Sequence, residues 1–188
     1  WGGRRGSRSA PGTASGCGRG FVCRAGGSAG GHLVALAALT ASGPPYQPGF
    51  EDVDTSVSGG VPYYAVYDMG GETGTKAARV RRRRLLDRLV MKTTDDQVYR
   101  DAAPLAAVRP DAPPFFVIHG RNDTLVPVEE ARLFVERLRA ISTSPVLYLE
   151  LPGTEHAFDV FPSIRSAHVV RAVGRFVELL RHRAAQQP

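Results

Sequence analysis

A serine flanked by glycines stands near the start of the sequence, in the segment Gly26-Gly27-Ser28-Ala29-Gly30. The apolar run Phe21 to Cys23 precedes it, and an Ala- and Leu-rich stretch from His32 to Thr40 follows. A G-x-S-x-G motif between a strand and a helix holds its serine on a strained turn, where the Oγ is exposed as a nucleophile. The glycines two positions away on either side are expected to give that turn its room. A glycine-rich loop before a helix can also cradle a phosphate, although no Gly-Lys-Ser/Thr follows as in a Walker A loop.

A serine nucleophile needs a base to take its proton and an acid to orient that base. Asp123 follows the apolar run Phe115 to Ile118, and His156 follows the run Val146 to Leu151. Loops that follow parallel strands meet at one edge of the sheet, so both side chains are expected beside Ser28. The chain order serine, aspartate, histidine is that of α/β-hydrolases, unlike the chymotrypsin and subtilisin orders. Two alternatives stay open: an N-cap or Asx turn for the aspartate, and its replacement as the acid by Glu155.

Alternating strands and helices must hold these residues in place. Four apolar runs predict buried strands, at Phe21 to Cys23, Val61 to Tyr67, Phe115 to Ile118 and Val146 to Leu151. Helices are predicted at His32 to Thr40, at 128–141 and at 164–181. This alternation indicates an α/β fold with a mostly parallel sheet covered on both faces. Residues 68–110 interrupt it with two polar helical stretches, and we expect them to form a small insertion that caps the carboxyl edge of the sheet.

The composition suits one globular domain, with 188 residues of which 43% are hydrophobic. The formal net charge is +6, but the first 31 residues hold five arginines and no acid, which leaves +1 on the rest. Nucleic-acid binding would be indicated by basic residues interleaved with aromatic residues, and the sequence has no such segment. Two cysteines are too few for a disulfide scaffold or a cysteine-based zinc site. No apolar run reaches the roughly 18 residues of a membrane span.

The two ends of the sequence differ in character. Residues 1–20 are mostly Gly, Arg, Ser and Ala, and we expect them to be disordered or translated in a wrong frame, with residues 21–188 forming the domain. No segment near Trp1 has the order of a signal peptide, which favours a cytoplasmic location. Because Trp1 is not an initiator Met, we expect a piece of a longer protein.

The histidines show no metal-ligand spacing, and neither a metal nor a cofactor is expected. His119, just upstream of the candidate acid, is expected to brace the acid loop.

The motifs resemble those of α/β-hydrolase carboxylesterases of the hormone-sensitive-lipase-like type. GGSAGGHL is similar to the glycine-rich elbow of that family, and FFVIHGRNDTLVPVEEA and LELPGTEHAF are similar to its acid and base segments. The resemblance runs from about Phe21 to the C-terminus. It implies that Ser28 is the nucleophile, Asp123 the acid, His156 the base and the Ala29 N–H an oxyanion-hole donor. It also implies that residues 68–110 belong to a substrate cap.

The sequence departs from the family pattern upstream of the elbow. Family members have a His-Gly-Gly-Gly-type loop there, which supplies further oxyanion donors, and Trp1-Gly2-Gly3 lies too close to the serine to replace it. The four strands found here correspond to the fifth to eighth strands of the family. The resemblance therefore implies a partial α/β-hydrolase fold, the C-terminal half of the sheet. An open edge at the first strand favours self-association.

These observations favour a carboxylic ester hydrolase that acts through a Ser-Asp-His triad and an acyl-enzyme. Tyr63, Tyr64 and Tyr67 are candidate pocket walls, which favours small or medium acyl esters over charged substrates. One alternative is a serine peptidase of the prolyl-oligopeptidase type, which shares the triad order. The other is an inactive hydrolase fragment that serves as an interaction module.

Overall fold

The computed structural model of the chain describes residues 20–41, 43–81, 87–88 and 91–186. The segment expected to be disordered or mis-framed, residues 1–20, lies outside these ranges except for Gly20. Among the described residues, no helix combines the length and the apolar character that crossing a bilayer requires.

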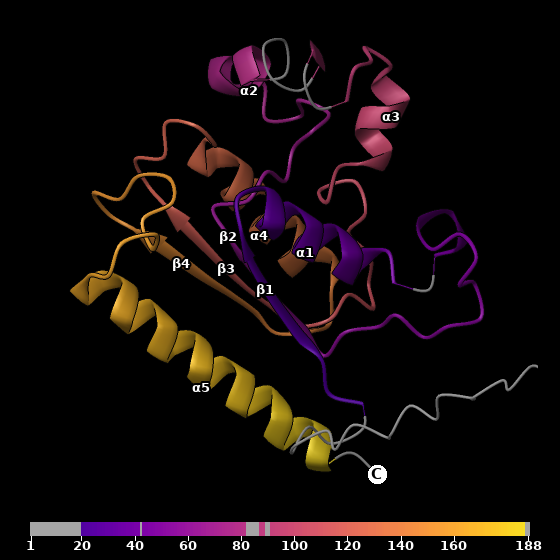
Figure 1. Cartoon of the computed structure of the whole chain (residues 1–188), viewed down its shortest axis with the longest axis vertical. Coiled ribbons are helices and arrows are strands. Elements are labelled where there is room, and N and C mark those ends of the chain that lie inside the picture. The colour runs from indigo at the N-terminus through magenta and orange to yellow at the C-terminus, as the bar shows by residue number, and fades with distance from the viewer. Residues whose placement is uncertain (1–19, 42, 82–86, 89–90, 187–188) are drawn as a thin grey trace, which may run out of the picture.

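A parallel sheet of four strands, in the order β1-β2-β3-β4, forms the centre of the molecule (Figure 1). The strands are β1 (Cys23–Gly27), β2 (Gly59–Tyr63), β3 (Phe115–Gly120) and β4 (Val146–Leu151). Gly27 pairs with Tyr63, and Gly120 pairs with Leu151, so neighbouring strands end nearly level with one another. The loops that follow all four strands therefore meet at one edge, as the sequence predicted.

The first two strands lie at different residues from those predicted. β1 begins two residues later than expected and continues to Gly27, and β2 begins at Gly59 and ends at Tyr63. The end of β1 and the start of β2 were missed because they contain glycines, which in sequence are typical of strand ends rather than of strands. Here a Cβ on Gly60 would lie 2.9 Å from the Phe115 ring, so the missing side chain makes room for the core. β2 ends because Tyr64 adopts a φ of 35°.

Helices cover both faces of the sheet. The helices α1 (Ala29–Leu39) and α4 (Val128–Ile141) lie on one face, and α5 (Ile164–Gln186) lies on the other (Figure 1). Ala35, Phe115 and Phe134 belong to the core on the first face, whereas Phe116 and Phe176 belong to the core on the second. The predicted α/β class, with a parallel sheet covered on both faces, is confirmed.

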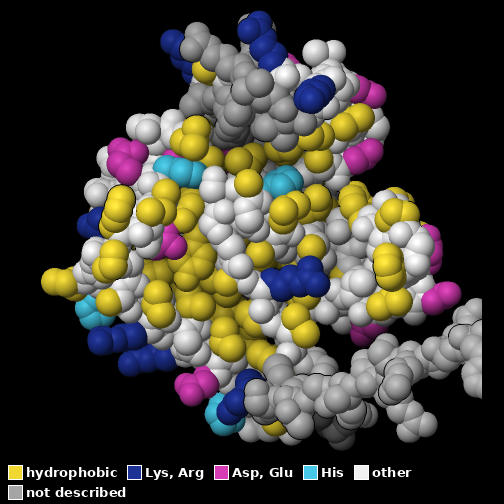
Figure 2. All heavy atoms as spheres, viewed as in Figure 1, with side chains coloured by type: hydrophobic (Ala, Val, Ile, Leu, Met, Phe, Trp, Pro, Cys, Tyr) yellow, Lys and Arg dark blue, Asp and Glu magenta, His cyan; other side chains and the backbone are white. Residues whose placement is uncertain are grey.

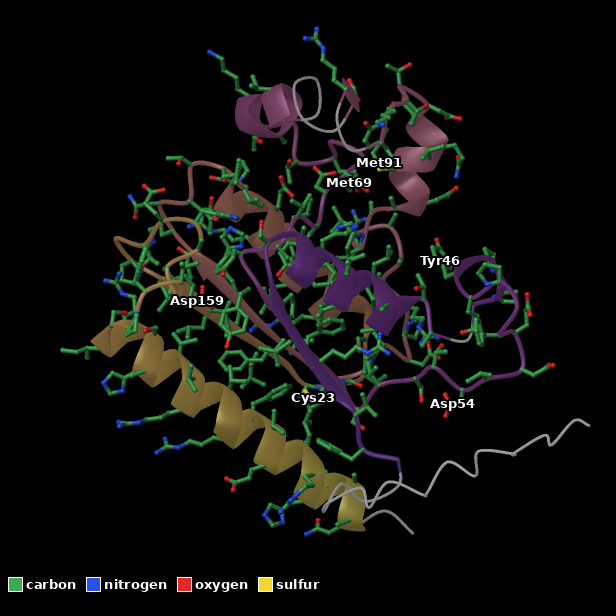
Figure 3. The ribbon with its side chains drawn as sticks, viewed as in Figure 1. Cys23, Tyr46, Asp54, Met69, Met91 and Asp159 are labelled. Carbon is green, nitrogen blue, oxygen red and sulfur yellow. The ribbon has the colours of Figure 1, made fainter. Side chains whose placement is uncertain are left out.

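The insertion of residues 68–110 lies on the side of the molecule where the strands end (Figure 1). It contains α2 (Lys76–Arg81) and α3 (Asp96–Asp101), and no strand occurs among its described residues. Met69 and Met91 lie near each other there (Figure 3), in a small apolar cluster with the buried Tyr99. Arg137 of α4 donates to Glu72 at 2.7 Å and ties the insertion to the domain. A 3₁₀ helix, η1 (Pro44–Tyr46), lies in the separate connection between α1 and β2.

β1 is an edge strand in the described part of the chain, where it pairs with β2 alone. Figure 2 shows hydrophobic side chains gathered between this strand and α5. Phe21 and Cys23 are only partly buried there, against the core on the α5 face. The predicted open edge is therefore bordered by apolar surface.

Candidate active site

Ser28 lies on the turn between β1 and α1 with a φ of 53° and a ψ of −119°. This backbone conformation is strained for a residue with a Cβ, and it persists only where the surroundings enforce it. The Ser28 N–H donates to the Tyr63 carbonyl at 3.0 Å, and the Ser28 carbonyl accepts from the His32 N–H at 2.9 Å. The turn is thus fixed by β2 on one side and by the first turn of α1 on the other.

Two glycines let β1 and α1 approach each other around Ser28. A Cβ on Gly26 would lie 2.7 Å from the Gly30 carbonyl carbon, which real structures do not tolerate. A Cβ on Gly31 would lie 2.8 Å from the Gly26 carbonyl oxygen on β1. A Cβ on Gly30 would meet no described atom outside its own helix within 4 Å. The steric requirement expected at Gly26 and Gly30 is therefore present at Gly26 but falls on Gly31 instead of Gly30.

His156 lies between the serine and the aspartate and contacts both. Its Nε2 is 2.9 Å from the Ser28 Oγ, and its Nδ1 is 2.7 Å from Asp123 Oδ2. A carboxylate only accepts hydrogen bonds, so Nδ1 carries the proton and Nε2 presents its lone pair to the serine hydroxyl. The structure thus joins, in one hydrogen-bonded chain, three residues that the sequence places up to 128 positions apart.

Asp123 is buried, and its two carboxylate oxygens have separate partners. Oδ1 accepts from the backbone N–H groups of Leu125 and Val126, at 2.9 and 2.8 Å, and so closes an Asx turn. Oδ2 faces His156. Burial raises the pKa of Asp123, but hydrogen bonds from His119, the Val126 N–H and His156 outweigh it and leave this pKa below its ordinary value. The two roles considered for this residue, Asx turn and partner of the histidine, therefore occur together.

Glu155 and His119 both brace the loop that carries Asp123. Glu155 accepts from the N–H and the hydroxyl of Thr124, each at 3.2 Å, so its carboxylate lies against the acid loop. The fully buried His119 has its Nε2 3.0 Å from the Val126 carbonyl and 3.4 Å from Asp123 Oδ2. Its Nδ1 is buried and has no hydrogen-bond partner within the described ranges, so the proton belongs on Nε2.

The three tyrosines suggested as pocket walls have different surroundings. The Tyr64 ring lies edge-on to the His156 imidazole, with centroids 4.7 Å apart, and Tyr63 lies 6.4 Å from Phe158. Tyr67 is completely buried and stacks on Phe134 at 4.4 Å. Tyr67 therefore belongs to the core between the sheet and α4 rather than to a pocket wall, and that assignment is corrected.

Ala29 is the first residue of α1, directly after Ser28. N–H groups in the first turn of a helix lack intrahelical acceptors and lie at the positive end of the helix dipole. The Ala29 N–H is therefore suited to hold an oxygen that gains negative charge next to the serine.

Sequence reasoning did not anticipate the contact between Tyr64 and His156, because the two side chains come from distant segments.

The four-stranded parallel sheet and the serine on its strand-to-helix turn define a protein of the α/β-hydrolase class. A family model described as BD-FAE matches residues 16–138, and the chain belongs to this family. The chain is 51% identical over 160 residues to the probable carboxylic ester hydrolase LipM of Mycobacterium tuberculosis, covering 84% of this chain and 37% of that protein. It is 46% identical over 172 residues to esterase LipC of the same organism, covering 89% of this chain and 42% of that protein.

Solved structures agree on the fold. Thermogutta terrifontis esterase 2, phosphoramylated by tabun, matches with a TM-score of 0.67 at 20% identity, over 84% of this chain and 54% of that one. A truncated carbohydrate esterase from gut microbiota matches with a TM-score of 0.64 at 17% identity, over 89% of this chain and 61% of that one. The chain spans about two fifths of the length of the two curated relatives. The resemblance to carboxylesterases that the three motifs indicated is confirmed.

Proposed function

We propose that the protein is a serine carboxylic ester hydrolase with Ser28 as nucleophile, His156 as base and Asp123 as the acid that orients the base. The observation that carries this proposal is the continuous hydrogen-bonded chain from the Ser28 Oγ through the imidazole to a buried carboxylate. The names of the curated relatives, a carboxylic ester hydrolase and an esterase, support the same reaction class.

The reaction follows from the protonation states in that chain. His156 Nε2 takes the Oγ proton as Ser28 attacks the ester carbonyl carbon, and Asp123 stabilises the imidazolium that forms. The Ala29 N–H donates to the oxyanion of the tetrahedral intermediate. The imidazolium then protonates the departing alkoxide, which leaves an acyl-enzyme on Ser28. A water molecule, deprotonated by Nε2, then attacks the acyl carbon. The carboxylic acid product departs as the proton on Nε2 passes to the Ser28 Oγ.

An oxyanion hole usually has more than one donor, and here we propose Ala29 for one of them. We further propose that the others come from chain that precedes residue 1 in the whole protein, as the resemblance to carboxylesterases implies. The matched region makes up 37% and 42% of the two curated relatives, so proteins of this kind have further chain in which such donors can lie. We propose small or medium uncharged acyl esters as substrates, because aromatic rings of Tyr63, Tyr64 and Phe158 gather beside the imidazole.

The experiment measures the release of p-nitrophenol from p-nitrophenyl butyrate by the 188-residue chain and by Ser28→Ala. We expect at least one equivalent of p-nitrophenol from the chain, and only the background rate from the variant. A prolyl p-nitroanilide assayed in parallel tests the peptidase alternative and should be cleaved far more slowly than the ester. Equal release by Ser28→Ala, or faster cleavage of the anilide, would contradict the proposal. Absence of release from both the chain and a form extended upstream would favour the inactive interaction module.

A further inference from the structure

Tyr64 directly follows β2 and has the unusual φ of 35°. Its N–H donates to the Ile118 carbonyl on β3 at 2.8 Å, so the backbone is fixed to the centre of the sheet despite this strain. The residue as a whole is only 5% exposed. A non-glycine residue with positive φ at the active edge of a sheet is a position where surrounding structure enforces an unfavourable conformation.

The Tyr64 ring contacts the loop that carries the base. It lies 4.7 Å from the His156 imidazole and 5.6 Å from the Phe158 ring, in edge-to-face arrangements with both. Edge-to-face contacts of this kind are favourable for aromatic rings. The ring therefore packs against the base and against Phe158 on the loop that carries it, which limits the movement of both.

The Tyr64 hydroxyl reaches beyond His156 along the same loop. It donates to Asp159 Oδ1 at 2.5 Å, a hydrogen bond between residues 95 positions apart. Burial is the largest cause that raises the pKa of Tyr64, and this hydrogen bond to a carboxylate raises it further. The hydroxyl therefore keeps its proton and remains a donor. The same hydroxyl would lie 2.5 Å from a Cβ on Gly27, so the glycine next to the nucleophile makes room for it.

We propose that Tyr64 and Asp159 form a latch that positions the His156 imidazole between Ser28 and Asp123. The latch rests on the proposed function, since its target is the proposed base. Both residues are positioning residues, because they act on the reaction only through His156.

The base loop needs such a latch because its own backbone is strained. Ala157, next to the base, has a φ of 55°. On one side of His156, Glu155 attaches the loop to Thr124. On the other side, Asp159 attaches it to Tyr64. With the second attachment removed, the loop can turn about Ala157, and Nε2 moves away from the serine Oγ.

The first test observes His156 directly and does not depend on turnover. It compares the NMR resonance of the His156 Nδ1–H in the 188-residue chain with that in Tyr64→Phe and in Asp159→Ala. Tyr46→Phe is the matched control, because Tyr46 donates its hydroxyl to the Asp101 carbonyl at 3.0 Å and lies on the opposite side of the molecule from Asp159 (Figure 3). We expect the resonance to broaden or shift upfield in both latch variants and to stay unchanged in the control. An unchanged resonance in both latch variants would overturn the proposal.

The second test is kinetic. We expect each latch variant to lower kcat about 10- to 100-fold with little change in KM, since a misplacement near 1 Å at the reacting atoms has effects of this size. The double variant should be no worse than either single variant, because both substitutions remove the same hydrogen bond. Asp159→Asn, which keeps an acceptor oxygen, should recover part of the loss. Additive losses, or a rise in KM with kcat unchanged, would show that these residues are not a latch.

The two proposals fail in different ways. A latch without catalysis would show the change in the His156 resonance while Ser28→Ala and the unaltered chain release p-nitrophenol equally. Catalysis without a latch would show Ser28-dependent release while Tyr64→Phe keeps both the resonance and kcat. Thermal unfolding of all variants, followed in parallel, separates a displaced loop from an unfolded chain.

Discussion

Replacement of Asp123 by asparagine changes one carboxylate oxygen into an NH₂ group and leaves the size of the side chain unchanged. Two backbone N–H groups, from Leu125 and Val126, point at Oδ1, so the amide oxygen must take that position. The NH₂ then occupies the place of Oδ2, 2.7 Å from His156 Nδ1. Because NH₂ donates, Nδ1 must become the acceptor and the ring proton moves to Nε2. That proton then points at the Ser28 Oγ, and the base can no longer accept from it.

We expect this substitution to lower kcat about 10⁴-fold, the effect of the corresponding change in triad enzymes. The two bonds of the Asx turn survive, so the unfolding free energy should fall by no more than about 1–2 kcal/mol. The assay is steady-state hydrolysis of p-nitrophenyl butyrate with thermal unfolding followed by circular dichroism. Glu155→Gln is the matched change, and it should lower kcat far less because Glu155 bonds Thr124. A larger loss for Glu155→Gln than for Asp123→Asn would refute the assignment of the acid.

Other predictions concern the scaffold. A Cβ on Gly120 would overlap the Thr154 carbonyl on the base loop, so Gly120→Ala should lower stability by about 1–3 kcal/mol and reduce kcat. A Cβ on Gly174 of α5 meets no described atom outside the helix within 4 Å, so Gly174→Ala should raise the unfolding free energy by about 0.5–1 kcal/mol. Equal effects of Gly120→Ala and Gly174→Ala in urea unfolding would contradict both expectations. The Arg132 guanidinium, with smaller contributions from neighbouring donors, lowers the pKa of Glu150 to about 2 from its ordinary 4.5. The ionised Glu150 carboxylate therefore stabilises the fold above pH 4.5 and loses that effect as pH falls toward 2. Glu150→Gln should accordingly reduce the unfolding free energy by about 1 kcal/mol at pH 7 and not at pH 2. A deficit that persists at pH 2 would show another cause. Finally, the open edge at β1 should make the isolated chain self-associate, and a monomer in sedimentation velocity would contradict that expectation.

Most of the fold could be predicted because the decisive segments follow simple periods. The strand at Val146–Leu151 and the helix at Val128–Ile141 lie at the predicted residues. Both have regular apolar spacing bounded by clear turn residues. The ends of β1 and β2 could not be predicted, because glycines such as Gly59 and Gly60 pair as strand residues only where a side chain from another element fills the space above them.

The proximity of the three candidate catalytic residues could also be predicted, because each follows a strand of one parallel sheet. The surroundings of the individual tyrosines could not. Tyr64 and Tyr67 both follow the end of β2, yet the first contacts His156 and the second is stacked in the core on Phe134. The backbone turns at Tyr64, where φ is 35°, and no periodicity in the sequence reveals such a turn. The hydrogen bond from Tyr64 to Asp159 joins residues 95 positions apart, and no pattern in the sequence predicted it either.

The most direct test of the central claim is to identify the residue that reacts with a fluorophosphonate probe. Such a probe forms a bond only with an activated serine, and Ser28 has the base, at 2.9 Å, that would activate it. The chain is treated with the probe, digested and analysed by mass spectrometry, with Ser28→Ala and His156→Ala treated alongside. The proposed mechanism predicts labelling on the peptide that carries Ser28, loss of labelling in the first variant and strongly slowed labelling in the second. Labelling of another serine with Ser28 unmodified, or equal labelling of His156→Ala, would contradict it.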